Sequence, residues 1–62
     1  MTWLKDIRKE KQMTQTKVAK EAHISQGSYS NIELGNKKPC VKTAKAIAEV
    51  LGFDWTEFYK AG

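Results

Sequence analysis

The sequence predicts an all-α fold, a compact five-helix bundle that contains a helix-turn-helix. Apolar residues recur at helical spacing, capping residues interrupt the chain at short intervals, and no alternating run is long enough for a convincing strand. The 62 residues leave room for one domain, residues 1–62, because domains usually hold about 100–200 residues.

The first two helices are expected near the amino terminus. The first covers residues 2–11, with Leu4 and Ile7 as its inner apolar pair. The second covers residues 15–22, and Thr14 before it is a favourable N-cap.

A third helix is expected over residues 26–34, capped by Ser25 and ended by Gly35. Only residues 22–24 separate it from the second helix. So short a connection forces the two helices to meet at a steep angle, which is the geometry of a helix-turn-helix over residues 15–34. This pattern alone does not exclude a generic pair of packed helices.

Two further helices complete the expected bundle. The fourth covers residues 41–51 and stops at Gly52. Asp54 and Glu57 have the spacing of a capping box for a short last helix. The apolar side chains that these helices would add to the core are Ala44, Ile47, Ala48, Leu51, Trp55 and Phe58.

Composition excludes several classes of protein. No apolar run approaches the ~18 residues of a membrane span, and the amino terminus lacks a signal peptide's apolar block. We therefore expect a soluble, cytoplasmic protein without a membrane partner. One cysteine, Cys40, and one histidine, His23, exclude an internal disulfide and a closed zinc site. No catalytic set or phosphate-binding loop is evident, so we expect no enzyme activity, metal, cofactor or small-molecule ligand.

The positive charge is concentrated in one segment. The net charge is +4, and residues 36–45 hold four lysines and no acidic residue. A local basic patch on a neutral body indicates a polyanionic partner. A solvated lysine-rich loop is the alternative.

The third helix has an unusual outer face. Tyr29 and Ile32 share its inner face, and the outer face carries small and amide side chains without charge. Gly, Ser and Asn are weak helix formers. Gln and Asn can pair two hydrogen bonds with an adenine edge in the major groove, whereas the alternative is a merely polar surface helix. The outer residues are Gly27, Ser30, Asn31 and Leu34, with Gln26 at the flank.

Residues 15–34 resemble the helix-turn-helix of phage Cro and repressor proteins, which belong to the XRE-like class of bacterial regulators. The resemblance extends from Leu4 to Phe58. The matching positions are Thr14, Gln15, Val18, Ala19, Ala22, Ile24, Tyr29, Ile32, Glu33, Gly35, Pro39, Ala44, Ile47, Ala48, Leu51 and Gly52.

The resemblance implies that the third helix enters the major groove of DNA. Gln15 would brace the reading residue Gln26, and Arg8 and Glu33 would form a partly buried ion pair. Together with the outer face of the third helix, it predicts the base-reading residues Gln26, Gly27, Ser28, Ser30 and Asn31. The expected phosphate-binding residues are Thr14, Gln15, Lys17, Asn36, Lys37 and Lys38.

Some positions depart from the family pattern. His23 stands in the turn where glycine is usual, and we expect it to take a positive φ rather than to act as a metal ligand or pH sensor. Tyr29 is larger than the usual residue, so its hydroxyl should reach the surface or a partner. Leu34 replaces a polar residue and would cover a sugar or face a partner subunit. We interpret Cys40 as an inert N-cap substitute rather than a redox switch.

The expected function is sequence-specific binding of double-stranded DNA. By resemblance, the protein would act as a repressor in a bacterial or phage-infected cell, binding an inverted repeat as a homodimer. Two alternatives stay open. One is the amino-terminal DNA-binding domain of a longer repressor. The other is a protein-interaction module that uses Trp3, Leu34, Trp55 and Tyr59.

Overall fold

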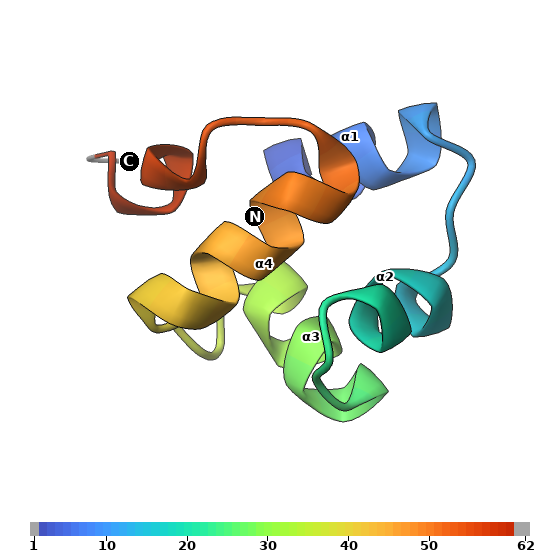
Figure 1. Cartoon of the computed structure of the whole chain (residues 1–62), viewed down its shortest axis with the longest axis horizontal. Coiled ribbons are helices and arrows are strands. Elements are labelled where there is room, and N and C mark those ends of the chain that lie inside the picture. Colours follow the sequence, from blue (N-terminus) through green and yellow to red (C-terminus); the bar gives the residue numbers. More distant parts are fainter. Residues whose placement is uncertain (1, 61–62) are drawn as a thin grey trace.

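The computed structural model describes residues 2–60, and all regular secondary structure in this part of the chain is helical, without strands. The all-α class is therefore confirmed (Figure 1). The elements in chain order are α1 (Thr2–Glu10), α2 (Gln15–Glu21), α3 (Gln26–Leu34), α4 (Val41–Leu51) and the 3-10 helix η1 (Trp55–Tyr59).

The expected five-helix bundle needs one correction, because the fifth element is a 3-10 helix. The Glu57 N–H bonds the Asp54 carbonyl at 3.0 Å, which is the i to i−3 pattern of a 3-10 turn. The predicted capping box does not form. Asp54 accepts from the Thr56 N–H, whereas the Glu57 carboxylate pairs with Lys60.

The predicted bounds of α3 and α4 are confirmed, and α1 and α2 each end one residue earlier than expected. The residues beyond these two ends still make helical hydrogen bonds. The Lys11 N–H bonds the Ile7 carbonyl, and the Ala22 N–H bonds the Val18 carbonyl. Lys11 and Ala22 therefore each make the last helical hydrogen bond before the turn that follows α1 or α2.

A left-handed residue follows each of the four α-helices, in the pattern of a Schellman motif. After α2, His23 has a φ of 62°, as its place in the turn predicted. Gly35 follows α3 with a φ of 82°, and Gly52 follows α4 with a φ of 77°. After α1, Gln12 has a φ of 57°, a conformation that the sequence did not reveal.

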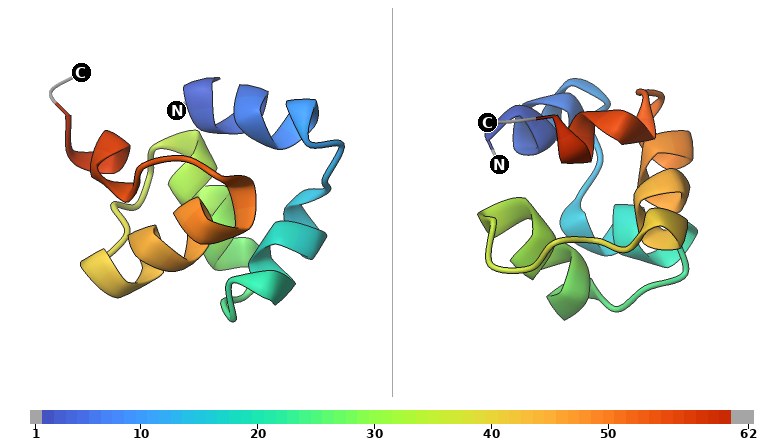
Figure 2. Two further views of the ribbon diagram at one scale, coloured as in Figure 1. Left: turned by 45° about the horizontal axis from the view of Figure 1, so that its top comes forward. Right: turned by 90° about the vertical axis from the view of Figure 1, so that its left-hand side faces the viewer.

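The core lies where α2 meets both α3 and α4, with α1 packed on α3 (Figure 2). η1 folds back beside α1, where Trp3 lies 5.3 Å from the ring of Phe58. Trp3 also meets Phe53 edge-on, so it covers the edge of the core. The buried apolar residues are Leu4, Val18, Ala19, Ala22, Tyr29, Ile32, Ala44, Ile47, Ala48, Leu51 and Phe58.

Within residues 2–60, no helix has the length and apolar character that crossing a membrane requires. The same residues contain no cluster of three His, Cys, Asp or Glu side chains arranged to hold a metal ion.

Candidate nucleic-acid interface

The crossing of α2 and α3 depends on small residues. Ala19 and Ala22 are almost fully buried, which lets the two helices approach closely. The Ile24 N–H bonds the Ala19 carbonyl at 3.0 Å, so the turn is tied directly to the end of α2. The positive φ of His23 then redirects the chain into α3.

α3 begins with a capped first turn. The Ser25 hydroxyl oxygen accepts from the Ser28 N–H at 3.1 Å, and the Ser25 hydroxyl donates to Ser28 Oγ at 2.9 Å. Gln26 and Gly27 lie at the start of the helix and are exposed. The cap therefore presents both residues to solvent at the amino-terminal end of α3.

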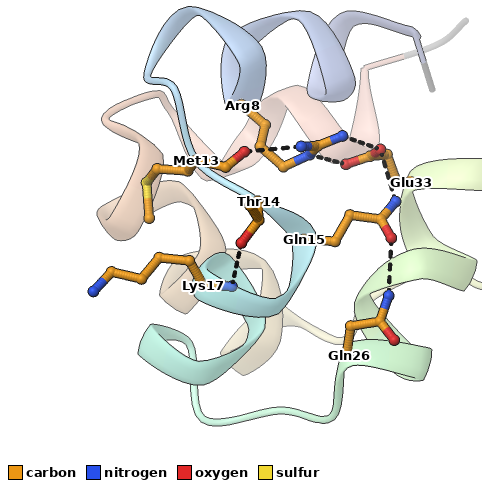
Figure 3. Close-up of polar contacts among 7 residues, drawn as sticks. All are labelled: Arg8, Met13, Thr14, Gln15, Lys17, Gln26 and Glu33. Atoms are coloured by element: carbon orange, nitrogen blue, oxygen red, sulfur yellow. Dashed lines mark hydrogen bonds and ion pairs between the residues drawn. The ribbon is translucent and has the colours of Figure 1, made fainter.

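A partly buried ion pair joins α1 to α3 (Figure 3). Arg8 Nε donates to Glu33 Oε2 at 2.9 Å, and Arg8 Nη2 donates to Glu33 Oε1 at 3.1 Å. Arg8 Nη1 also donates to the Met13 carbonyl at 2.8 Å. The guanidinium thereby ties together α1, the loop before α2, and α3.

Two glutamines extend this pair to the surface. Gln15 Nε2 donates to Glu33 Oε1 at 3.1 Å, and Gln26 Nε2 donates to Gln15 Oε1 at 2.9 Å (Figure 3). An ionised carboxylate can only accept hydrogen bonds. Glu33 therefore requires the amide nitrogen of Gln15, and the Gln15 oxygen that faces the other way requires the nitrogen of Gln26. We call this series of contacts, Arg8–Glu33–Gln15–Gln26, the polar relay.

The ionisation of Glu33 determines the direction of the polar relay. Burial by itself raises the pKa of Glu33, but the hydrogen bonds from Arg8 and Gln15, together with the neighbouring Tyr29 hydroxyl, outweigh it and leave the pKa below its ordinary value. The hydrogen bonds between Arg8 and Glu33, which favour the charged form of both partners, also raise the pKa of Arg8. Glu33 is thus a carboxylate at neutral pH.

The Tyr29 hydroxyl takes one of the two positions that the sequence suggested, beside a partner instead of at the surface. The Tyr29 side chain is fully buried, so its hydroxyl does not reach the surface. The hydroxyl lies next to the ion pair instead. Burial, followed by the neighbouring Glu33 carboxylate, raises the pKa of Tyr29.

The five residues expected to read bases differ in exposure. Gln26, Gly27 and Asn31 are exposed, whereas Ser28 and Ser30 are half-buried. The Ser28 hydroxyl is engaged by the Ser25 cap. A Cβ placed on Gly27 would meet nothing within 4 Å, so this part of the face is open.

The residues expected to bind phosphate lie in two places. At the start of α2, Thr14 caps the helix by accepting from the Lys17 N–H at 3.1 Å. Lys17 Nζ lies 3.4 Å from Glu21, so a phosphate would compete with this exposed ion pair. Asn36, Lys37 and Lys38 are exposed in the loop between α3 and α4.

Aromatic side chains of η1 lie beside the basic segment, a contact that sequence reasoning missed. Lys38 lies over the ring of Tyr59, and Lys45 lies over the ring of Trp55. The lysines and the aromatic residues were both noted in the sequence, but no local spacing relates residues so far apart.

A family model described as helix-turn-helix matches residues 4–58. The chain belongs to this helix-turn-helix family. The resemblance to phage repressors of the XRE-like class is confirmed by this match and by the relatives of the chain.

Three curated proteins illustrate the similarity within the helix-turn-helix family. The HTH-type transcriptional regulator YqaF of Bacillus subtilis is 52% identical over 94% of this chain and 76% of its own length. The immunity repressor protein of Bacillus phage phi105 is 37% identical over 79% of this chain, which spans only 34% of that protein. The ImmF control region protein of the same phage is 41% identical over 82% of this chain and 57% of its own length. No solved structure matches the chain.

Two positions that depart from the family pattern have a clear structural setting. Cys40 occupies the N-cap position of α4 but makes no side-chain capping bond, and its thiol lies 3.3 Å from the Thr43 hydroxyl. Leu34 is 67% exposed at the end of α3.

Of the four residues weighed for a protein-interaction surface, Trp3 and Trp55 are half-buried, whereas Leu34 and Tyr59 are exposed.

Proposed function

We propose that this helix-turn-helix protein is a transcriptional regulator that binds double-stranded DNA and reads base pairs with α3. The observation that carries the proposal is the polar relay, because it holds an exposed glutamine amide in one orientation at the start of α3. The names of the relatives, a transcriptional regulator and an immunity repressor, agree with it.

The orientation of Gln26 suits an adenine. Its Nε2 donates one hydrogen to Gln15, which leaves one N–H and the Oε1 acceptor for a ligand. Adenine presents an acceptor, N7, beside a donor, the N6 amine, in the major groove. Gln26 can therefore pair both groups without reorienting, and Gly27 lets the helix approach closely. Asn31 offers a second amide further along the exposed face.

Binding strength would come from contacts to phosphate. Lys37 and Lys38 are exposed in a loop whose backbone is tied to α3, since the Asn36 and Lys37 N–H groups both bond the Asn31 carbonyl. Such contacts give register and affinity without sequence information. Thr14, Gln15 and Lys17 would contribute a second set at the start of α2.

The regulator would bind as a two-fold dimer. A helix of nine residues reaches only a few base pairs. The molecule measures 27 × 21 × 19 Å, so two copies fit on half-sites ~34 Å apart without overlap. By excluding polymerase from an overlapping promoter, such a dimer would repress transcription.

A selection from random duplexes tests this proposal. The chain should enrich an inverted repeat whose half-sites are centred about one helical turn, ~34 Å, apart. A variant with both Gln26→Ala and Asn31→Ala serves as the control, and it should bind duplexes without enriching the same repeat. No enrichment by the wild type would contradict sequence reading, and enrichment of a single unpaired site would contradict the dimer.

A further inference from the structure

The loop between α3 and α4 is held at both of its ends. At its start, the Asn31 carbonyl accepts from the Asn36 N–H at 2.9 Å and from the Lys37 N–H at 3.2 Å. At its other end, the Tyr59 hydroxyl donates to the Pro39 carbonyl at 2.6 Å. Tyr59 belongs to η1, so an element twenty residues away restrains the loop.

Tyr59 also holds the side chain of Lys38. The Lys38 ammonium lies 5.4 Å from the centroid of the Tyr59 ring, which is within the range of a cation–π contact. The ring covers one side of the ammonium, and an ammonium has three donors. Because Lys38 is exposed, its remaining N–H groups stay available to an anion.

Trp55 and Lys45 form a similar pair close by. The Lys45 ammonium lies 5.1 Å from the Trp55 ring, and the Trp55 and Tyr59 rings meet edge-on with centroids 5.8 Å apart. Lys45 lies within α4, outside the loop. This pair therefore offers a matched control for the pair formed by Tyr59 and Lys38.

We propose that Tyr59 is a positioning residue for phosphate binding. This inference rests on the proposed function, because it assigns Tyr59 to the loop that would contact the DNA backbone. Its hydroxyl fixes the peptide that follows Pro39, and its ring restricts the rotamers of the Lys38 side chain. Both contacts order the loop before DNA arrives, so less side-chain entropy is lost on binding.

The expected losses of affinity follow from these contacts. Lys38→Ala should weaken binding to a random duplex by up to about tenfold at 0.1 M salt, since one phosphate contact contributes ~0.9 to the salt slope. Tyr59→Leu should weaken it by about two- to fivefold, the range of an exposed cation–π contact. Tyr59→Phe keeps the ring but loses the hydroxyl, so its affinity should lie between the wild type and Tyr59→Leu.

A double-mutant cycle on a random duplex tests the proposal. Tyr59→Leu is measured in the wild-type, Lys38→Ala and Lys45→Ala backgrounds, at one salt concentration and well below each melting temperature. In the Lys38→Ala background, the loss caused by Tyr59→Leu should shrink to the part that comes from the hydroxyl contact with Pro39, whereas it should persist in full in the Lys45→Ala background. Tyr59 is partly exposed, so we expect every variant to fold.

A second measurement needs no DNA. In proton NMR spectra of the free protein, the ring current of Tyr59 should shift the ε-methylene signals of Lys38, as that of Trp55 should shift those of Lys45. Tyr59→Leu should abolish the Lys38 shift and leave most of the Lys45 shift, whereas Tyr59→Phe should keep both.

The outcomes separate this inference from the proposed function. If Lys38→Ala weakens binding but Tyr59→Leu costs the same in all three backgrounds, Tyr59 acts only on overall structure and the inference is overturned. An unshifted Lys38 signal in the wild type would overturn it as well. If neither Lys37→Ala nor Lys38→Ala weakens binding, the phosphate role in the proposed function fails, and the inference fails with it.

Discussion

Glu33 has the most connected side chain of the candidate interface. It is almost fully buried, and its carboxylate accepts from Arg8 on one side and from Gln15 on the other. Because the charged carboxylate can only accept hydrogen bonds, Gln15 must turn its amide nitrogen, Nε2, towards Glu33. A single ionisable group in the interior thereby orients Gln26 at the surface.

Glu33→Gln should lower stability in a pH-dependent way. Because the pKa of Glu33 in the folded protein lies below the ordinary value of 4.5, its stabilising contribution is complete above about pH 4.5 and is lost at lower pH. At pH 7 the variant should be less stable by ~1–3 kcal/mol, since Arg8 keeps its buried charge without a carboxylate. The difference should narrow as the pH falls below 4.5.

Urea unfolding of both proteins at several pH values measures this difference. Asp54→Asn is the control, because hydrogen bonds from Thr56 also lower the pKa of that exposed carboxylate. It should remove only a small part of the pH dependence. If the free energies of unfolding of the wild type and Glu33→Gln differ by the same amount from pH 7 to pH 3, Glu33 is not ionised in the folded protein.

At the scale of single residues, the sequence predicted what depends on local conformation. His23 was expected to take a positive φ because it stands in a short turn between two predicted helices, and it does. Gln12 takes the same conformation, but glutamine gives no compositional sign of it. The buried hydroxyl of Tyr29 depends on how α1 and α3 pack, which no local pattern contains.

α3 combines low helix propensity with an open outer face. Its nine residues include Gly27 in the first turn and Asn31 in the middle, and the space above Gly27 is empty. The helix therefore relies on its caps at Ser25 and Gly35 and on the buried Tyr29 and Ile32.

Gly27→Ala should raise stability and weaken DNA binding together. Alanine stabilises a helix by about 0.5–1 kcal/mol relative to glycine, and its methyl group meets no atom of this protein. The same methyl group would stand between α3 and the groove floor. Thermal unfolding and duplex affinity of one preparation measure both effects.

Gln12→Gly provides the control for Gly27→Ala. It relieves a left-handed residue at the end of α1 and should add a similar stability while leaving DNA affinity unchanged. If Gly27→Ala binds DNA as well as the wild type does, the start of α3 does not approach the groove closely.

Ala19→Leu should disturb the crossing of α2 and α3. Ala19 is 2% exposed, so the added carbons would overpack the contact at a cost of ~1–3 kcal/mol. The displaced α3 should also bind DNA more weakly. An unchanged melting temperature together with unchanged binding would contradict the packing described for these two helices.

At the scale of elements, capping residues predicted most of the fold. Thr14 and Ser25 cap α2 and α3 as expected, and Gly35 and Gly52 end α3 and α4. The form of η1 was not predictable in this way. Whether five residues close i to i−3 or i to i−4 bonds depends on tertiary contacts, such as that of Phe58 with Trp3, two residues that lie far apart in the sequence.

Across the whole molecule, the excess positive charge lies in residues 36–45, and Lys37 and Lys38 are exposed there. Changing both lysines to alanine should lower the affinity for specific and for random duplexes by similar factors. The slope of log K against log salt should become shallower by at most ~2, because each phosphate contact contributes ~0.9. Titrations at several salt concentrations measure the slope. A loss confined to the specific site would mean that these lysines read bases.

The affinity of Gln26→Ala for a set of operator variants tests the central claim most directly. The set carries each of the four base pairs at every position of the selected site, and both proteins are measured at one salt concentration. With Gln26 oriented by the polar relay, the variant should lose ~1–3 kcal/mol on the preferred operator and its preference at one symmetric base-pair position. Its melting temperature and salt slope should stay close to those of the wild type. Equal losses on every operator would contradict the account, because Gln26 would then only position the helix.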